Sequence, residues 1–288
     1  MTDLNNSPST RPAASAPSYQ FTTIGGKRLA YIDQGQGFPV LLGHSYLWNA
    51  TMWQPQLDAL SRHFRVIAPD LWGHGCSESP PDGTGGLDDL ARHHLALLDA
   101  LSIEQCHVIG LSVGGMWAAA MKRLAPERVT KLVLMDTYLG PEPAPSQARY
   151  LGLLRQLEVD RALSGALLDI VVPMFFSPRT DPASALCQAF RASLAALPAD
   201  RIADSIVPLG RLIFTRPDHR PGLSGLNADN TLVMVGEDDI PRPVREAAEM
   251  AALIGCPLST VGDAGHISNL ENPQSVTRTL RDFLLNGH

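Results

Sequence analysis

Short apolar segments alternate with longer helical segments along most of the chain, and this order restricts the fold more than any other feature of the sequence. Segments such as 38–43 and 231–236 are almost entirely apolar and do not alternate with polar residues. A strand of that kind is buried on both faces, as in a parallel sheet covered by helices. We therefore expect an α/β fold with a mostly parallel, eight-stranded sheet. The strands are predicted at residues 19–24, 28–35, 38–43, 65–70, 105–111, 129–136, 230–236 and 256–262.

The alternation stops between the sixth and seventh of these strands. Residues 138–225 carry leucine- and alanine-rich helical patterns that prolines interrupt. We interpret this part as a helical cap, or lid, inserted into one core, and that core comprises residues 19–137 and 226–288. The first residues, 1–18, are rich in Ser, Pro, Ala and Asn, a composition that predicts a disordered tail.

The residues directly after each strand are the first place to look for a site, because ligands of open parallel sheets bind beyond the carboxyl ends of the strands. Ser112 follows the fifth strand within Gly110-Leu111-Ser112-Val113-Gly114, which fits G-x-S-x-G. A sharp turn from strand to helix at such a motif exposes the serine as a nucleophile. Glycine-rich turns can also bind phosphate, but no lysine follows Gly115, and residues 110–115 do not fit G-x-G-x-x-G. Ser112 is the predicted nucleophile.

A serine hydroxyl needs a base to take its proton, and the base needs a group that orients it. Of the nine histidines, His266 is favoured because it lies in a glycine-containing loop after the last strand. The loop after the seventh strand offers three acids, of which Asp239 is preferred over Asp238 and Glu237. The resulting chain order, Ser-Asp-His, is the order found in one particular fold.

With these residues in view, the sequence resembles the α/β-hydrolase family over nearly everything except the tail. The shared segments are "GLSVGG", "DLWGHGCSE", "APERVTKLVLMD", "VGEDD" and "GHISNLENP". The segment after the third strand departs from the family, which usually has His-Gly-x there, because this chain has Gly43-His44-Ser45-Tyr46. A His-Ser version and the "GLS-x-GG" turn resemble the 3-oxoadipate enol-lactonase branch.

The resemblance implies an oxyanion hole made of two backbone N–H groups. Aligning His44 with the family histidine assigns these donors to Tyr46 and Val113, whereas the other alignment assigns the first of them to His44 itself. For the substrate pocket we expect contacts from Trp48, Met174 and Phe175, and core packing is the alternative for each of them.

These residues predict a carboxylic ester hydrolase that cleaves an ester or lactone of a small to medium apolar substrate through an acyl-enzyme on Ser112. The same three residues also serve C–C bond hydrolases, perhydrolases and acyltransferases. A non-catalytic ligand receptor on the same fold is the alternative from another class. No metal and no organic cofactor is expected.

Composition bears on the partners and the compartment. The 288-residue chain is 44% hydrophobic, and its net charge of −6 argues against a nucleic-acid partner, which requires a basic face. No segment reads as a signal peptide or a membrane span, and none of the four cysteines is paired at C-x-x-C spacing. We expect a cytoplasmic enzyme that acts on a small-molecule ester or lactone. The sequence is also compatible with a homodimer.

Overall fold

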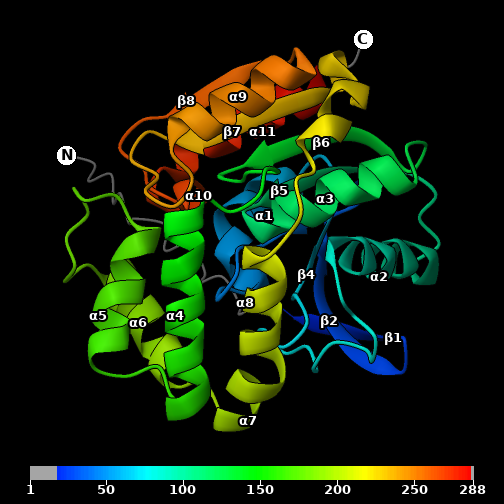
Figure 1. Ribbon diagram of the computed structural model, residues 1–288. Coiled ribbons are helices and arrows are strands. Elements are labelled where there is room, and N and C mark those ends of the chain that lie inside the picture. Colours follow the sequence, from blue (N-terminus) through cyan, green and yellow to red (C-terminus); the bar gives the residue numbers. More distant parts are fainter. Residues whose placement is uncertain (1–17, 287–288) are drawn as a thin grey trace, which may run out of the picture.

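A computed structural model describes residues 18–286, and its centre is one sheet of eight strands in the order β1-β2-β4-β3-β5-β6-β7-β8 (Figure 1). The expected tail therefore lies outside the described residues, apart from Ser18. The strands are β1 (Tyr19–Ile24), β2 (Lys27–Gln34), β3 (Pro39–Gly43), β4 (Arg65–Pro69), β5 (Cys106–Leu111), β6 (Val129–Met135), β7 (Thr231–Gly236) and β8 (Leu258–Val261).

The eight-stranded, mostly parallel sheet confirms the predicted fold class. Only the pairs β1–β2 and β2–β4 are antiparallel, and every other neighbouring pair is parallel. Strands β1 and β2 form a hairpin, in which Gly25 and Gly26 both have positive φ angles, of 57° and 78°. Glycine adopts that conformation without steric cost, which explains the glycine pair at the turn.

Right-handed crossovers place the helices on both faces of the sheet. The connection from β3 to β4 runs in one direction along the sheet, and those from β4 to β5 and from β5 to β6 run in the other, so their helices cover opposite faces. Accordingly α1 packs against α11, while α2 packs against α3. The bounds of these core helices are α1 (Gln54–Leu60), α2 (Leu87–Ala100), α3 (Val113–Leu124), α9 (Val244–Ile254), α10 (Ser268–Glu271) and α11 (Pro273–Leu285).

The helix that connects β3 to β4 is short. It begins as a 3₁₀ turn, η1 (Ala50–Trp53), in which the Asn49 side chain caps the N–H of Thr51. Pro55 lies in the first turn of α1, where its missing N–H costs no hydrogen bond. The reversal of direction at β3 and β5 is the point where open sheets of this kind form a crevice.

Residues 138–225, hereafter the inserted segment, are helical and gather on one side of the sheet (Figure 1). Helices α4 and α8 pack along each other within this segment. Its elements are α4 (Ala144–Asp160), α5 (Ala166–Val171), η2 (Val172–Phe175), α6 (Ala185–Ala195), α7 (Ala199–Arg201), η3 (Ile202–Ile206), α8 (Val207–Phe214) and η4 (Arg220–Gly225).

The inserted segment lies between two strands that are neighbours in the sheet. Strand β6 precedes the segment, β7 follows it after the short turn η5 (Ala228–Asn230), and these strands pair in parallel, with Leu132 beside Thr231. The segment is therefore an excursion from the carboxyl end of β6. Within residues 18–286, no helix has the length and the apolar character needed to cross a membrane.

Candidate active site

Ser112 occupies a strained turn between β5 and α3. Its φ and ψ angles are 60° and −121°, a combination that side chains other than glycine rarely adopt. Glycines make the turn sterically feasible, because a Cβ on Gly110 would lie 2.2 Å from the Gly114 oxygen, and one on Gly114 would lie 2.2 Å from the Gly43 oxygen. A Cβ on Gly115 would also lie 2.7 Å from Thr137 Cγ2, so this glycine lets α3 pack closely against the segment after β6.

The structure brings the three predicted residues together in one chain of contacts. Ser112 Oγ lies 3.0 Å from His266 Nε2, and His266 Nδ1 lies 2.9 Å from Asp239 Oδ2. The Asp239 side chain is fully buried and that of His266 is 5% exposed. With its proton on Nδ1, the imidazole donates to Asp239 and accepts from the Ser112 hydroxyl. This is the geometry in which a histidine can take a proton from a serine.

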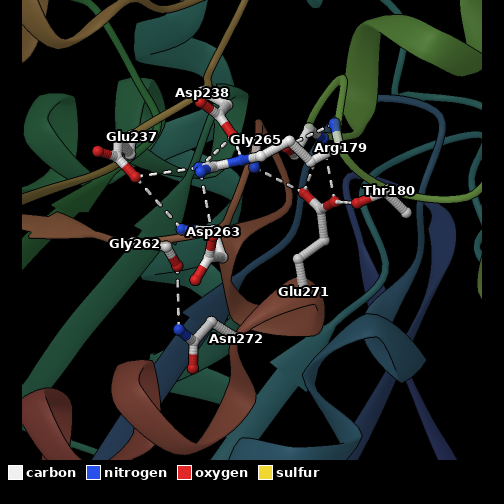
Figure 2. Close-up of polar contacts among 10 residues, drawn as sticks. Arg179, Thr180, Glu237, Asp238, Gly262, Asp263, Gly265, Glu271 and Asn272 are labelled. Carbon is white, nitrogen blue, oxygen red and sulfur yellow. Dashed lines mark hydrogen bonds and ion pairs between the residues drawn. The ribbon is translucent and has the colours of Figure 1, made fainter.

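The two other acids of the β7–α9 loop have different partners. Asp238 accepts a hydrogen bond from the Ser177 hydroxyl and forms an ion pair with Arg179 at 2.7 Å, and Glu237 contacts the same arginine at 3.0 Å (Figure 2). Both therefore face the inserted segment. Asp239 is the acid of this loop that contacts His266.

Glu271 of α10 holds the loop that carries His266. Its carboxylate accepts hydrogen bonds from the backbone N–H of Gly265 at 2.7 Å and from that of Ser177 at 3.0 Å, and it also contacts the Thr180 hydroxyl (Figure 2). One carboxylate thus ties the residue before His266 to the inserted segment. No sequence motif had singled out Glu271.

A second buried carboxyl group, Asp136, lies near Asp239. It directly follows β6 and accepts hydrogen bonds from the Gly236 N–H at 2.7 Å and the Ser268 hydroxyl at 2.6 Å. Burial, followed by the neighbouring charge of Asp239, raises the pKa of Asp136 well above its usual range. Asp136 was also missed, although its position directly after a strand was a signal for it.

The backbone N–H groups of Tyr46 and Val113, the predicted oxyanion donors, have no acceptor among the described residues. Tyr46 follows β3, and its N–H donates to no acceptor among the described residues. Val113 is the first residue of α3, where an N–H has no partner within the helix. The Tyr46 side chain points toward η3, since its hydroxyl donates to the Ile206 carbonyl at 2.5 Å. The Ser45 hydroxyl is buried and also has no partner within residues 18–286.

His44, the alternative in this loop, has a structural environment. Its Nε2 accepts the Leu71 N–H at 2.7 Å, and its Nδ1 donates to the Ser45 carbonyl at 2.7 Å. Burial lowers the pKa of His44 to about 3, so the ring is neutral at ordinary pH. The imidazole thereby fixes the loop that carries Tyr46.

A pocket opens above Ser112 and His266, and mostly apolar side chains line it. Met174 and Phe175, which the sequence suggested as substrate contacts, both line this pocket and an adjoining cavity within the inserted segment. The walls of the adjoining cavity are almost wholly apolar: Tyr46, Leu47, Tyr150, Leu153, Leu154, Leu157, Leu163, Leu167, Val171, Met174, Phe175 and Phe214.

Trp48 does not line either of these cavities, contrary to the expectation that it contacts substrate. Its ring stacks on Phe190 at a centroid distance of 4.1 Å and an interplanar angle of 8°, and it meets Phe175 edge-on. Trp48 therefore packs the inserted segment onto the core, which was the alternative interpretation of its sequence position. The pocket expectation was wrong because aromatic residues of the segment occupy the space beside the ring.

Four charged residues form a buried cluster at the same pocket. Glu142 lies at the start of the inserted segment and Arg216 near its end. Arg242 lies in the β7–α9 loop and Glu246 in the first turn of α9. Arg216 pairs with Glu142 at 3.0 Å, Arg242 also contacts Glu142, and Arg242 lies 3.3 Å from Glu246. Glu142, Arg216 and Arg242 line the pocket together with Ser112. No local sequence pattern predicts this cluster, because its members lie far apart in the chain.

Comparison with known proteins agrees with this architecture. Residues 39–161 match the family model for the alpha/beta hydrolase fold. The chain is 30% identical over 276 residues to the 2-hydroxymuconate semialdehyde hydrolase of Pseudomonas putida, covering 90% of this chain and 91% of that protein. It is also 30% identical over 273 residues to 3-oxoadipate enol-lactonase 1 of Acinetobacter baylyi, covering 93% and 97% respectively.

A solved structure of an esterase is also similar to this chain in three dimensions. A thermophilic esterase from Thermogutta terrifontis, in a malate-bound form, superimposes with a TM-score of 0.79 at 29% identity, covering 94% of this chain and 98% of that one. The similarity to these relatives extends across the sheet and the inserted segment alike, since each alignment spans nine-tenths of the chain or more. The chain therefore belongs to the α/β-hydrolase fold family.

Proposed function

We propose that the protein is a serine hydrolase that cleaves a carboxylic ester or lactone through an acyl-enzyme on Ser112. One observation carries this proposal: the chain of contacts from Ser112 Oγ through His266 to Asp239, with lengths of 3.0 and 2.9 Å, at the base of a pocket. Similarity to an enol-lactonase and to an esterase supports the ester and lactone chemistry.

In this mechanism, Ser112 Oγ attacks the substrate carbonyl carbon while His266 Nε2 accepts the hydroxyl proton. Asp239 keeps the other ring proton on Nδ1 and stabilises the imidazolium that forms. The N–H groups of Tyr46 and Val113 stabilise the oxyanion, and loss of one such donor costs about a hundredfold in kcat or more. His266 then protonates the leaving oxygen, and it later activates a water molecule that releases the acid.

The cavities favour a substrate with an apolar portion. The cavity that adjoins the pocket within the inserted segment is lined by leucine, valine, methionine and aromatic side chains. An acyl chain or an apolar alcohol transferred from water into that cavity gains about 0.8 kcal/mol per buried methylene. The substrate class we propose is accordingly a small to medium ester or lactone with an apolar part.

A second candidate is hydrolysis of a C–C bond in a diketone by the same three residues. Its support is the similarity to the 2-hydroxymuconate semialdehyde hydrolase over nine-tenths of the chain. Both reactions begin with attack at a carbonyl carbon and differ in the group that leaves. A substrate panel separates them: turnover of a 1,5-diketone that exceeds turnover of every ester and lactone would favour C–C hydrolysis.

Labelling with a fluorophosphonate probe tests the proposal directly. The probe is expected to modify Ser112 in the native protein, and Ser112→Ala is expected to abolish both labelling and most hydrolysis of 4-nitrophenyl esters. A folded Ser112→Ala variant with undiminished turnover would contradict the mechanism. A native protein that binds esters without labelling or turnover would instead support a non-catalytic receptor.

A further inference from the structure

We propose that the Tyr46 hydroxyl positions an oxyanion donor by tying it to the inserted segment. This inference rests on the proposed hydrolase function, in which the backbone N–H of Tyr46 stabilises the oxyanion. The hydroxyl of the same residue donates to the carbonyl of Ile206, a residue of the inserted segment, at 2.5 Å. The side chain of Tyr46 therefore acts as a positioning group for its own backbone, and the inserted segment completes the active site.

The two proposed oxyanion donors are held in different ways. Val113 begins the 12-residue helix α3, so its N–H is fixed by a long regular element. The Tyr46 N–H belongs instead to a short turn between β3 and η1, residues 45–48, hereafter the oxyanion turn. The Trp48 N–H closes this turn by donating to the Ser45 carbonyl at 3.1 Å. The second donor is thus only as well placed as the oxyanion turn.

The oxyanion turn does not hold its shape unaided. Its third residue, Leu47, has a φ angle of 68°, in the left-handed region that favours glycine. A leucine in that conformation is strained, and it persists only where neighbouring groups fix it. One fixing contact is the Leu47 N–H, which donates to Nε2 of the buried His74 at 3.0 Å. The Tyr46 hydroxyl supplies another, from the residue directly before Leu47.

The Tyr46 phenol occupies a space that fits it. Its ring meets His74 and Phe214 edge-on, at centroid distances of 5.5 and 6.1 Å. Gly210 of α8 leaves room for the hydroxyl, because a Cβ there would lie 2.6 Å from Tyr46 Oη. A phenylalanine would satisfy the aromatic packing alone. The hydroxyl therefore adds a directed contact to that packing.

The acceptor lies in an unusual turn that is itself held against the core. Residues Ile202–Ile206 form a π-helical turn, in which the Val207 N–H bonds to the Ile202 carbonyl. Such turns are rare and are frequently found at functional sites. This one packs closely on the loop after β4, since a Cβ on Gly73 would lie 2.0 Å from Ser205 Cβ. The π-helical turn therefore gives the oxyanion turn a firm point of attachment.

Tyr46→Phe tests the inference, because it removes the hydroxyl and keeps the ring. We expect kcat and kcat/KM for 4-nitrophenyl butyrate to fall together by about tenfold, with KM within about twofold of the wild type. The loss should be smaller than the roughly hundredfold effect of a missing donor, since the N–H remains but is less well placed. Rates are taken per site that a fluorophosphonate labels to completion, so misfolded protein does not count.

A transition-state analogue separates positioning from a merely structural role. When a pentyl trifluoromethyl ketone binds, Ser112 Oγ forms a bond to its carbonyl carbon, the carbonyl oxygen becomes an oxyanion, and the serine proton moves to His266. The matched alcohol forms no such adduct. In Tyr46→Phe we expect the Ki of the ketone to rise about tenfold and that of the alcohol to stay within about twofold. A merely structural role would not move these two constants apart.

Two further variants assign the effect to this contact. Tyr138→Phe is the matched control, because its hydroxyl also joins the inserted segment to the core, donating to Glu249 of α9 at 2.8 Å, and it lines neither cavity. This control should keep kcat within about twofold of the wild type. Gly210→Ala should displace the Tyr46 hydroxyl and lower kcat as Tyr46→Phe does. In the double variant the added methyl group fits the space of the missing hydroxyl, so the two losses should not add.

The outcomes separate the two proposals. A wild-type protein that is neither labelled at Ser112 nor active would overturn the hydrolase function itself. A labelled, active enzyme in which Tyr46→Phe retains the wild-type kcat would overturn the positioning role alone. Equal changes in the two Ki values, an equal loss in Tyr138→Phe, or a Gly210→Ala loss that adds in full to that of Tyr46→Phe would also overturn the positioning role.

Discussion

Asp239 and Asp136 follow the neighbouring strands β7 and β6, and both are buried close to the candidate active site. Asp239 contacts His266, whereas Asp136 accepts hydrogen bonds from Gly236 and Ser268. Burial and the charge of Asp239 raise the pKa of Asp136. An asparagine amide at position 136 would keep one oxygen acceptor for the Gly236 N–H and would place an NH₂ donor beside the Ser268 hydroxyl, whose oxygen can accept.

This difference predicts opposite results for two similar substitutions. Asp239→Asn removes the charge that orients and stabilises the His266 imidazolium, and we expect kcat to fall by about 10³- to 10⁴-fold. Asp136→Asn keeps the acceptor for Gly236 and supplies a donor to Ser268, and we expect kcat within about tenfold of the wild type. Steady-state hydrolysis of a 4-nitrophenyl ester measures both. Equal losses in the two variants would mean that Asp136 carries the essential charge.

The site residues that could be predicted from the sequence are those that directly follow a strand. Ser112, Asp239 and His266 each follow a strand within a recognisable loop, so strand order alone brought them to one edge of the predicted sheet. Arg216 and Glu142 lie at opposite ends of the inserted segment. Strand order does not constrain that segment, and its several arginines look alike in the sequence. Their contact depends on how α4 and α8 pack, which no local pattern encodes.

At the scale of elements, two polar clusters join the inserted segment to the loops of the active site (Figure 2). Arg179 forms exposed ion pairs with Glu237, Asp238 and Asp263. Glu271, in contrast, is partly buried and accepts backbone N–H groups from both sides of the junction. Exposed pairs contribute little to stability, while loss of a buried acceptor leaves its donors without partners.

We therefore expect Glu271→Ala to destabilise the protein by about 2 kcal/mol. It should also lower kcat more than it changes KM, because the Gly265 N–H that anchors the His266 loop loses its acceptor. Denaturant unfolding and steady-state kinetics measure the two effects. Glu271→Gln, which keeps one oxygen for Gly265, should restore part of kcat, and a purely structural role would not produce that recovery.

Arg179→Ala is the matched comparison from the other cluster. Its side chain is 54% exposed, so we expect a loss of stability below about 1 kcal/mol that diminishes as salt is added. A loss as large as that of Glu271→Ala would show that the exposed cluster, rather than Glu271, holds the junction together.

At the scale of the whole molecule, buried neutral histidines link stability to pH. Burial is the main cause that lowers the pKa of four imidazoles from 6.5, to about 3 for His44 and to about 4 for His74, His94 and His107. Below pH 6.5 the unfolded chain binds protons that the folded protein excludes, so each group reduces stability as the pH falls toward 4. The size of this effect is about 1.4 kcal/mol per pH unit for each histidine.

Calorimetry should accordingly show a Tm that falls steadily between pH 6.5 and pH 4.5. His94→Phe should make this slope shallower, because it removes one such group and keeps a ring stacked on Trp117, where the present centroid distance is 3.8 Å. His63→Gln, at an exposed position, should leave the slope unchanged. An unchanged slope in His94→Phe would mean that other groups control acid unfolding.

The sequence predicted the core of the molecule better than its inserted segment. All eight strands form where they were predicted, and the apolar runs mark the central strands β3 to β7, because burial between two layers of helices demands apolar residues along nearly the whole strand. The helices of the inserted segment could be expected only as a group. These helices are short, and the prolines between them are compatible with several arrangements. The two cavities and the position of Trp48 are set by how the helices pack, so they could not be predicted from the sequence.

The two ends of the inserted segment lie close together, and this arrangement bears on how the chain can diversify. Near its start and its end, the His219 N–H donates to the Leu139 carbonyl at 2.9 Å. The entropy of closing such an excursion grows only with the logarithm of its length. Residues can therefore be gained or lost between the two ends at small cost to the core. Substrate range can change in this way while the turn at Ser112 keeps its shape.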